Sequence, residues 1–356
     1  MEKIKVGILG ATGYVGQRFV TLLDKHPYFE VKVLAASERS ASKRYEDSIR
    51  DRWKIEEKIP DYAKDIVLKD VYDIEEIVKE VDLVFSAVDM SKEEIRKIEE
   101  AYAKKEVVVV SNNSAHRFTL DVPVVIPEVN SDHFKIIEKQ KERLGTKKGF
   151  IVVKPNCSIQ CYVPLIDALR EYEPYLISIS TYQAISGAGK TFKDFPEIVD
   201  NIIPYIKGEE EKSEKEPLKI WGKVEGDRIV LNEDITISSQ CLRVPVSEGH
   251  MATVSVKFKK KPTKDEIIGK WNSYGALEYD LPHKTDKFIT YFEDDFRPQT
   301  KLDRDLYGGM GIAAGRLRED SIFDYKFIGL SHNTIRGAAG GALLTAELLY
   351  KMGYLD

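Results

Sequence analysis

A cysteine, an arginine and a histidine have the residue types and the setting that carbonyl chemistry requires. Cys157 lies in the segment VKPNCS at 153–158, and Arg243 and His250 bound the segment RVPVSEGH. A lone thiol is usually a small core residue, but a thiolate is also a strong nucleophile. Because an imidazole titrates near neutral pH and a guanidinium can hold a carboxylate, this set predicts covalent capture of a carbonyl group beside a hydride carrier.

A glycine-rich turn near the N-terminus predicts a nucleotide site. The sequence GATGYVG at 10–16 lies between an apolar strand at 4–9 and a helical pattern at 18–23, and a second strand follows at 29–36. Missing side chains let a pyrophosphate approach the backbone N–H groups at a helix start. The spacing departs by one residue from the commonest fingerprint, and a tight turn with purely structural glycines is the alternative. We expect the cofactor to contact Gly10, Thr12, Gly13, Tyr14, Val15 and Gly16.

The loop after the second strand, ASERSASK at 36–43, bears on the choice of cofactor. Ser37, Arg39 and Ser40 suit a 2′-phosphate, which favours NADP (NADPH) over NAD. Glu38 keeps the question open, since a carboxylate binds a free ribose hydroxyl. The alternative without a ligand is a solvated charged loop.

Two sheets are needed to position these groups. Apolar strands at 81–86 and 107–111 alternate with helices, which predicts a Rossmann-type, doubly wound α/β fold with a parallel sheet. After Cys157, alternating strands at 178–184, 235–238 and 252–258 predict a second α/β domain with a mixed sheet. We expect an NADP-binding domain at 1–155, completed by a C-terminal helix at 333–356, and a catalytic and dimerisation domain at 156–332. Helices are also expected near 159–169, with the positive end at Cys157, and at 208–215.

Composition excludes several classes of protein. A chain of 356 residues, 42% hydrophobic and 32% charged, is typical of a two-domain globular protein. A net charge of -5 offers no basic surface for nucleic acid, and no apolar run approaches the ~18 residues of a membrane span. Three cysteines make neither a disulfide framework nor a zinc site, so no metal is expected. The chain enters a strand at once, which leaves no room for a signal peptide and predicts a cytoplasmic location.

The motifs together resemble those of the aspartate-semialdehyde dehydrogenases, in particular their archaeal and fungal branch. The resemblance covers essentially the whole chain and rests on the glycine turn and on SNNSAHR at 111–117, PNCS at 155–158, TYQAISGAG at 181–189, GEEEK at 208–212, RVPVSEGH at 243–250 and HNTIRGAAGG at 332–341. It implies NADP-dependent, reversible reductive dephosphorylation of L-aspartyl 4-phosphate to L-aspartate 4-semialdehyde through a Cys157 thioester. That step belongs to lysine, threonine and methionine biosynthesis. A homodimer or homotetramer is also implied.

The resemblance gives individual residues their roles. Cys157 is the nucleophile and His250 the acid/base, while backbone N–H groups around Asn156 and Cys157 are the expected oxyanion donors. Arg243 fits the substrate carboxylate, and Glu209, or Glu210 in its place, fits the amine. Ile159 departs from the family, in which a small hydroxyl residue is common. The remaining assignments are Lys212 and Arg117 to phosphate, Gln183 to substrate orientation, and Ser186, Gly187 and Asn333 to the cofactor.

Three other functions fit parts of the pattern. A malonyl-CoA reductase shares the fold, the thiol and NADPH but needs no residue for an amine. An N-acetylglutamyl-phosphate reductase would not call for Glu209, because its substrate amine is acetylated. A non-catalytic NADP-binding protein would make Cys157 and His250 dispensable. Cys161 and Cys241 carry no motif and are predicted to be core residues.

Overall fold

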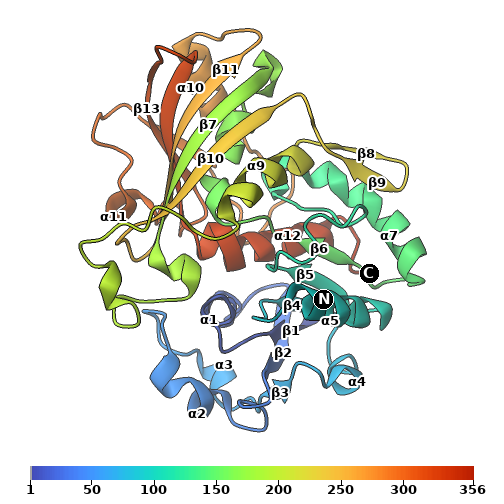
Figure 1. The fold of residues 1–356 in the computed structure, drawn as a ribbon. Coiled ribbons are helices and arrows are strands. Elements are labelled where there is room, and N and C mark those ends of the chain that lie inside the picture. The colour runs from blue at the N-terminus through green and yellow to red at the C-terminus, as the bar shows by residue number, and fades with distance from the viewer. Residues whose placement is uncertain (1) are drawn as a thin grey trace.

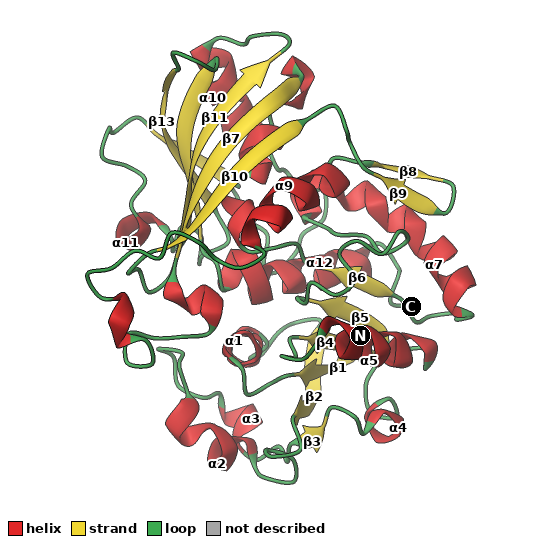
Figure 2. Cartoon of the chain, viewed as in Figure 1, coloured by secondary structure: helices red, strands yellow, loops and turns green. Residues whose placement is uncertain are grey.

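The structure, a computed structural model, describes residues 2–356. Two six-stranded sheets organise the chain, and the C-terminal helix α12 (Gly340–Lys351) runs between them (Figures 1 and 2). Every residue of α12 from Gly340 to Leu349 is buried, and the helix contacts β5 and α6 beside the first sheet. An apolar helix of this kind belongs in the interior, because it has no polar face to turn toward water.

The first sheet is parallel throughout and has the strand order β3-β2-β1-β4-β5-β6. This is the order of a dinucleotide-binding doubly wound fold, which confirms the predicted fold class. Its strands are β1 (Ile4–Leu9), β2 (Phe29–Ala36), β3 (Lys69–Asp70), β4 (Leu83–Ser86), β5 (Val108–Ser111) and β6 (Ile151–Val153). Its helices, besides α12, are α1 (Tyr14–Leu22), α2 (Tyr45–Ile49), α3 (Asp61–Lys64), α4 (Ile74–Ile77), α5 (Lys92–Lys104), α6 (Pro127–Asn130) and α7 (Ile137–Leu144).

The second sheet is mixed, as predicted, with the order β10-β7-β11-β14-β13-β12. Along β7 and β11 buried and half-buried residues alternate, which is the pattern of strands whose two faces meet different surroundings. The strands are β7 (Pro174–Gln183), β10 (Thr236–Arg243), β11 (His250–Phe258), β12 (Ile289–Phe292), β13 (Ile312–Glu319) and β14 (Tyr325–Ser331), with a separate hairpin of β8 (Lys223–Glu225) and β9 (Arg228–Val230). The helices are α8 (Val163–Asp167), α9 (Glu209–Ile220), α10 (Lys264–Ser273) and α11 (Thr300–Asp303).

The continuous helix expected at 159–169 is wrong. Cys157 precedes a 3-10 turn at Ser158–Cys161, and the short helix α8 then begins at Val163 with a proline in its first turn. Pro164 has no N–H to bond back to the preceding turn, so the helix restarts there instead of continuing. A single 3-10 turn carries only a small dipole, and the electrostatic help expected for the thiol is correspondingly small. The predicted charged helix at 208–215 is confirmed as part of α9.

Candidate active site

The glycine turn between β1 and α1 has the close packing that a phosphate cradle requires. Gly10 has φ of +85°, and a Cβ on Gly16 would lie 2.2 Å from the carbonyl oxygen of Gly10, so neither position admits a side chain. The turn borders a cavity of about 800 Å³, whose far wall is the segment Ser186–Gly189. The predicted cofactor contacts that line this cavity are Thr12, Gly13, Tyr14, Val15, Ser186 and Gly187.

The predicted 2′-phosphate residues lie after the end of β2. Ser37 and Arg39 are exposed there, whereas Ser40 is buried. Arg52 lines the cavity and donates from Nη2 to Oγ of Ser40 at 3.4 Å, so it adds a second cation to this end. The sequence did not reveal Arg52, because it lies twelve residues beyond Ser40 with no motif around it.

Cys157, which follows β6 of the first sheet, contacts His250 of the second sheet. Sγ of Cys157 lies 3.4 Å from Nε2 of His250, the first residue of β11. His250 is fully buried, and its Nδ1 accepts a hydrogen bond of 3.0 Å from the backbone N–H of Ala184. Since Nδ1 acts as an acceptor, the neutral imidazole carries its proton on Nε2. His250 therefore presents a hydrogen-bond donor, not a lone pair, to the sulfur.

Burial controls the protonation of both groups. It raises the pKa of the Cys157 thiol to about 11, with a further increase from the charge of Glu209. Burial also holds the pKa of His250 well below its ordinary value, and the charges of Arg243 and His332 act in the same direction. Without substrate, the pair is therefore a neutral thiol beside a neutral imidazole at neutral pH.

Glu209 is hydrogen-bonded to several of the predicted catalytic and substrate-binding residues. Its carboxylate accepts from Nδ2 of Asn156 at 3.0 Å, from Nε2 of Gln183 at 3.3 Å and from Nζ of Lys212 at 2.6 Å. Burial by itself raises the pKa of Glu209, but Lys212 and the two amides hold it below its ordinary value. Glu210 points elsewhere and accepts from the backbone N–H of Cys241 at 3.3 Å.

Arg117 approaches the site from the loop after β5 and is buried. Its Nη1 donates to Oε1 of Glu216 at 2.8 Å, and Oε2 of the same glutamate accepts the backbone N–H of Asn156 at 2.8 Å. The expectation that the Asn156 N–H serves as an oxyanion donor is therefore wrong, because Glu216 already occupies it. Glu216 was missed in the sequence, where it looks like one more acid of a charged helix.

Hydrogen bonds to neighbouring segments also position Arg243 and Asn333. Nη1 of Arg243 donates to the carbonyl oxygen of Ala184 at 2.6 Å. The amide of Asn333 accepts from the backbone N–H of Gly249 at 2.8 Å and donates to Oγ of Ser186 at 2.8 Å. Asn333 thus connects the segment before His250 to the wall of the cavity, and its contact with the nicotinamide stays a prediction.

Glu248 joins the same segment to α1. Its carboxylate accepts from the hydroxyl of Tyr14 at 3.2 Å, from Nη2 of Arg18 at 3.2 Å and from Oγ1 of Thr334 at 2.7 Å, and Nε2 of His332 lies 3.4 Å away. Burial by itself raises the pKa of Glu248, but His332, Arg18 and Thr334 hold it well below its ordinary value. The sequence singled out the motif around Glu248 but gave this residue no role.

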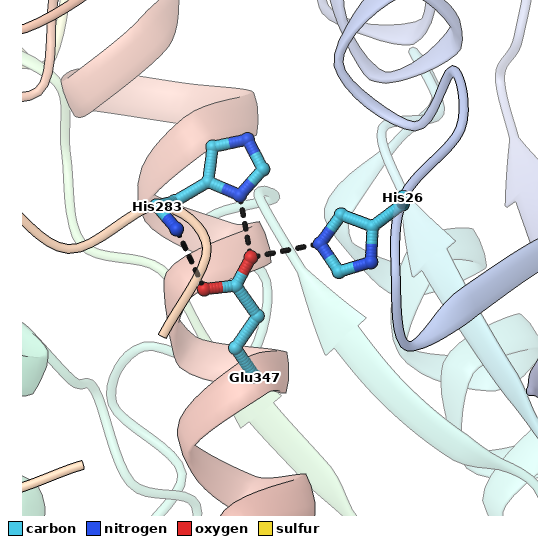
Figure 3. Close-up of side chains that lie close together, drawn as sticks. All are labelled: His26, His283 and Glu347. Atoms are coloured by element: carbon cyan, nitrogen blue, oxygen red, sulfur yellow. Dashed lines mark hydrogen bonds and ion pairs between the residues drawn. The ribbon is translucent and has the colours of Figure 1, made fainter. Parts of the chain in front are cut away.

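Figure 3 shows two histidines and a glutamate, His26, His283 and Glu347, whose side chains point toward one another. Glu347 of α12 accepts from Nε2 of His26 at 2.8 Å and from Nδ1 of His283 at 2.5 Å. Three such side chains can hold a metal ion. However, Nδ1 of His26 accepts the backbone N–H groups of Tyr28 and Phe29, both at 3.2 Å, so its proton is on Nε2. Nε2 of His26 then has no lone pair for a metal. The three side chains form a hydrogen-bonded cluster that ties α12 to the segments of His26 and His283.

Comparisons with known proteins agree with this geometry. Family models for the semialdehyde dehydrogenase NAD binding domain and dimerisation domain match residues 5–137 and 163–336. Aspartate-semialdehyde dehydrogenase from Archaeoglobus fulgidus is 42% identical, covering 98% of each chain, and that from Saccharomyces cerevisiae is 40% identical, covering 96% of each. The chain belongs to the aspartate-semialdehyde dehydrogenase family. A crystal structure of the Candida albicans member with NADP has a TM-score of 0.85 at 37% identity, covering 99% of this chain and 100% of that one.

Membership of the family confirms the resemblance seen in the sequence and identifies NADP as the cofactor. The residues present fit it, since Gly13 of the turn lines the cavity without a side chain and the cavity continues to Ser186 and Gly187. The match to a dimerisation domain points to a homo-oligomer. No helix within residues 2–356 has both the length and the apolar character needed to cross a bilayer.

The structure brings most predicted chemical residues into one place. Cys157, His250, Glu209, Asn156 and Gln183 are linked by direct contacts or by adjacency in the chain. Cys161 and Cys241 are buried free cysteines, which confirms them as core residues. The individual roles, and the domain boundaries at 155 and 332, stay predictions.

Proposed function

We propose that the chain converts L-aspartyl 4-phosphate to L-aspartate 4-semialdehyde and back, with Cys157 forming a thioester to the substrate. The contact of 3.4 Å between the Cys157 sulfur and Nε2 of His250, at the junction of the NADP cavity and the Glu209 cluster, carries this proposal. The domain division proposed is 1–155 with 333–356 around the cofactor and 156–332 around the substrate.

The substrate has a carboxylate and an amine that must be held on opposite sides. Arg243 bonds the chain through Nη1, and the rest of its guanidinium fork suits the carboxylate. Glu209, rather than Glu210, suits the amine, because its carboxylate lies beside Asn156 and Gln183 while Glu210 is bonded to Cys241. A malonyl-CoA substrate would leave Glu209 without a role.

In the reductive direction, the sulfur of Cys157 displaces phosphate from the acyl carbon, and the thiol proton leaves with the phosphate. Arg117 and Lys212 are the cations proposed to hold that phosphate, and each already pairs with a glutamate that positions it, Glu216 and Glu209 respectively. When bound, NADPH supplies a hydride in this direction, and NADP accepts one in reverse. The acyl thioester thus becomes a tetrahedral alkoxide, which collapses to the aldehyde and the thiolate.

His250 is proposed to stabilise these species by donating from Nε2. The bond from Ala184 to Nδ1 fixes the ring, so the Nε2–H points at the sulfur and then at the oxygen that develops negative charge beside it. A pre-aimed donor in a buried site contributes about 10²–10³ in rate. Because the alkoxide collapses to the aldehyde by breaking its C–S bond, the Nε2 proton can stay on His250 throughout.

Two further parts of the proposal concern assembly and location. A homodimer or a homotetramer is proposed from the match to the dimerisation domain, and sedimentation of the purified chain would distinguish them. A cytoplasmic location is proposed from the three unpaired cysteines, and imaging of a tagged chain tests it.

The test is phosphate-dependent reduction of NADP with aspartate semialdehyde, run beside a Cys157→Ala variant and beside malonyl-CoA with NADPH. Turnover that needs semialdehyde and phosphate and is lost in the variant is the expected result. Turnover with malonyl-CoA alone would overturn the roles of Glu209 and Lys212 and keep the thiol. Unchanged turnover in Cys157→Ala would overturn the thioester.

A further inference from the structure

Glu99 of α5 is a buried glutamate that the proposed reaction does not use. Its side chain is fully buried, and α5 contacts β5. Oε1 of Glu99 accepts from Oγ of Ser111 at 2.6 Å and from Nδ2 of Asn113 at 3.0 Å, whereas Oε2 has no hydrogen-bond partner among the described residues. Carboxyl groups are rarely buried in full unless they are paired, so the place of Glu99 behind this segment calls for an explanation.

The segment 111–117, which Glu99 holds, connects two parts of the proposed site. Asn112 and Asn113, near its start, line the NADP cavity. Arg117, at its end, is the proposed phosphate ligand, and its Nη2 donates to the carbonyl oxygen of Asn112 at 3.1 Å. The segment therefore folds back on itself. A displacement of Asn112 would move the wall of the cofactor cavity and the support of Arg117 together.

Asn113 is the residue through which Glu99 acts on the cavity. Besides its bond to Glu99, Nδ2 of Asn113 donates to Oγ of Ser86 at 3.0 Å, and its backbone N–H donates to Oγ of Ser111 at 3.0 Å. The carbonyl oxygen of Ser86, the last residue of β4, accepts the backbone N–H of Asn112 at 2.9 Å. Without Glu99, the hydroxyl of Ser111 and one N–H of Asn113 would lose their acceptor. The segment would then have to move to satisfy them.

The surroundings of Glu99 favour its neutral form. Burial raises the pKa of Glu99, and the bonds from Ser111 and Asn113 offset this only in part. Nε2 of His116 lies 4.0 Å from Oε2 of Glu99, but burial lowers the pKa of that imidazole to about 4, so it is uncharged at neutral pH. A glutamine at position 99 would keep the accepting oxygen and place its NH2 group where Oε2 receives no bond. A leucine would keep a similar volume and offer no acceptor.

We propose that Glu99 is a positioning residue for both the cofactor and the phosphate. By accepting from Ser111 and Asn113 it fixes the segment 111–117, and with it the cavity wall at Asn112 and the guanidinium of Arg117. This inference rests on the proposed function only for the phosphate role of Arg117, because binding of the cofactor can be measured without turnover.

Binding of NADPH to the full chain without substrate, followed by the fluorescence of NADPH, tests the first part. The variants are Glu99→Leu, Glu99→Gln and the control Glu347→Leu, which removes another buried glutamate that accepts from two side chains. We expect Glu99→Leu to raise Kd for NADPH about tenfold and Glu99→Gln to stay within about twofold of the unaltered protein. Glu347→Leu should lower the unfolding temperature and leave Kd unchanged.

Inorganic phosphate gives the second readout. With semialdehyde and saturating NADP, Glu99→Leu should raise KM for phosphate about tenfold and change kcat by less than about threefold, and Glu99→Gln should restore the normal KM. If Glu99→Leu does not fold, Ser111→Ala takes its place, because it removes one of the two donors and should raise Kd and KM in the same direction by less.

Three results would overturn the inference or a part of it. A lower unfolding temperature in Glu99→Leu with unchanged Kd and KM would show that Glu99 only stabilises the fold. An equal rise of Kd in Glu99→Gln would show that the accepting oxygen does not position the segment. A rise of Kd for NADPH with an unchanged KM for phosphate would overturn the link to Arg117. Absence of semialdehyde turnover, with the effect of Glu99→Leu on NADPH binding intact, would instead contradict the proposed function.

Discussion

Two glutamates, the half-buried Glu248 and the buried Glu347, join the first-sheet part of the molecule to the second, and their surroundings are alike. At the active-side junction Glu248 faces His332, Tyr14, Arg18 and Thr334, and at the far-side junction Glu347 faces His26 and His283. His332 and His26 have the same local geometry, because each Nδ1 accepts the backbone N–H groups two and three residues further on. Each imidazole then presents Nε2 to its carboxylate.

The two junctions differ in the residues and the cavity that adjoin them. Glu248 precedes His250 by two residues, and its partner Tyr14 lines the NADP cavity. At the far-side junction both oxygens of Glu347 are bonded, and the rings of His26 and His283 stack at 5.5 Å and 7°. Around Glu347, where both carboxylate oxygens are hydrogen-bonded, a glutamate and its histidine partners stabilise the fold. Around Glu248, the same residue types lie beside the NADP cavity and His250, where they can support catalysis.

The largest effect should come from the active side. His250→Asn removes the donor that faces the sulfur while the fold keeps its packing, so kcat should fall about 10²–10⁴-fold with little change in unfolding temperature. Steady-state kinetics and calorimetry on the same preparation measure both quantities. A normal kcat together with a much lower unfolding temperature would show instead that His250 stabilises the fold and does not support catalysis.

Glu347→Gln should affect stability and leave catalysis unchanged. The amide places an NH2 group where Oε2 of the carboxylate accepts the backbone N–H of His283, so this buried bond is lost, at a cost of about 1–3 kcal/mol. Denaturant unfolding measures the change, and kcat and KM at low temperature serve as the control. A large fall in kcat of the folded variant would show that the far-side junction also supports the active site.

A pair of tyrosines sharpens the contrast. Tyr14 donates to Glu248 and Tyr28 donates to the carbonyl oxygen of Asp280, both at 3.2 Å. Each Tyr→Phe change removes one bond worth about 0.5–1.5 kcal/mol. Tyr14→Phe should raise KM for NADP by up to about tenfold, whereas Tyr28→Phe should leave it unchanged. An equal change in KM for NADP in the two variants would show that the active-side junction has no special part in cofactor binding.

Low pH should reduce the stability that Glu347 contributes at the far-side junction, and this is the smallest of the expected effects. Burial by itself raises the pKa of Glu347, but the bonds from His26 and His283 and the charge of His283 hold it below its ordinary value of 4.5. A depressed folded-state pKa stabilises the fold above the unfolded value, and this stability is lost as pH falls through the folded value. The difference in unfolding temperature between the unaltered protein and Glu347→Gln should therefore narrow between about pH 6 and about pH 3. A constant difference would argue against this.

The sequence determined the elements and the chemical groups of this protein. The strands β1 and β2, the glycine turn and the mixed second sheet follow from periodicity and from the conformations that glycine allows, which are local properties. The types and motif positions of Cys157, Glu209 and His250 already indicated thiol chemistry on a carbonyl. The prediction of one helix at 159–169 was wrong because Pro164 interrupts it, although the apolar pattern around that residue is helical.

Only the tertiary structure decided which groups meet and how they are protonated. His250 lies 93 residues from Cys157, and the N–H that fixes its ring comes from Ala184, 66 residues away. The backbone N–H of Asn156 donates to Glu216, which lies 60 residues further along the chain. Hydrogen-bond partners, burial and pKa depend on contacts between distant segments, which no local pattern in the sequence encodes.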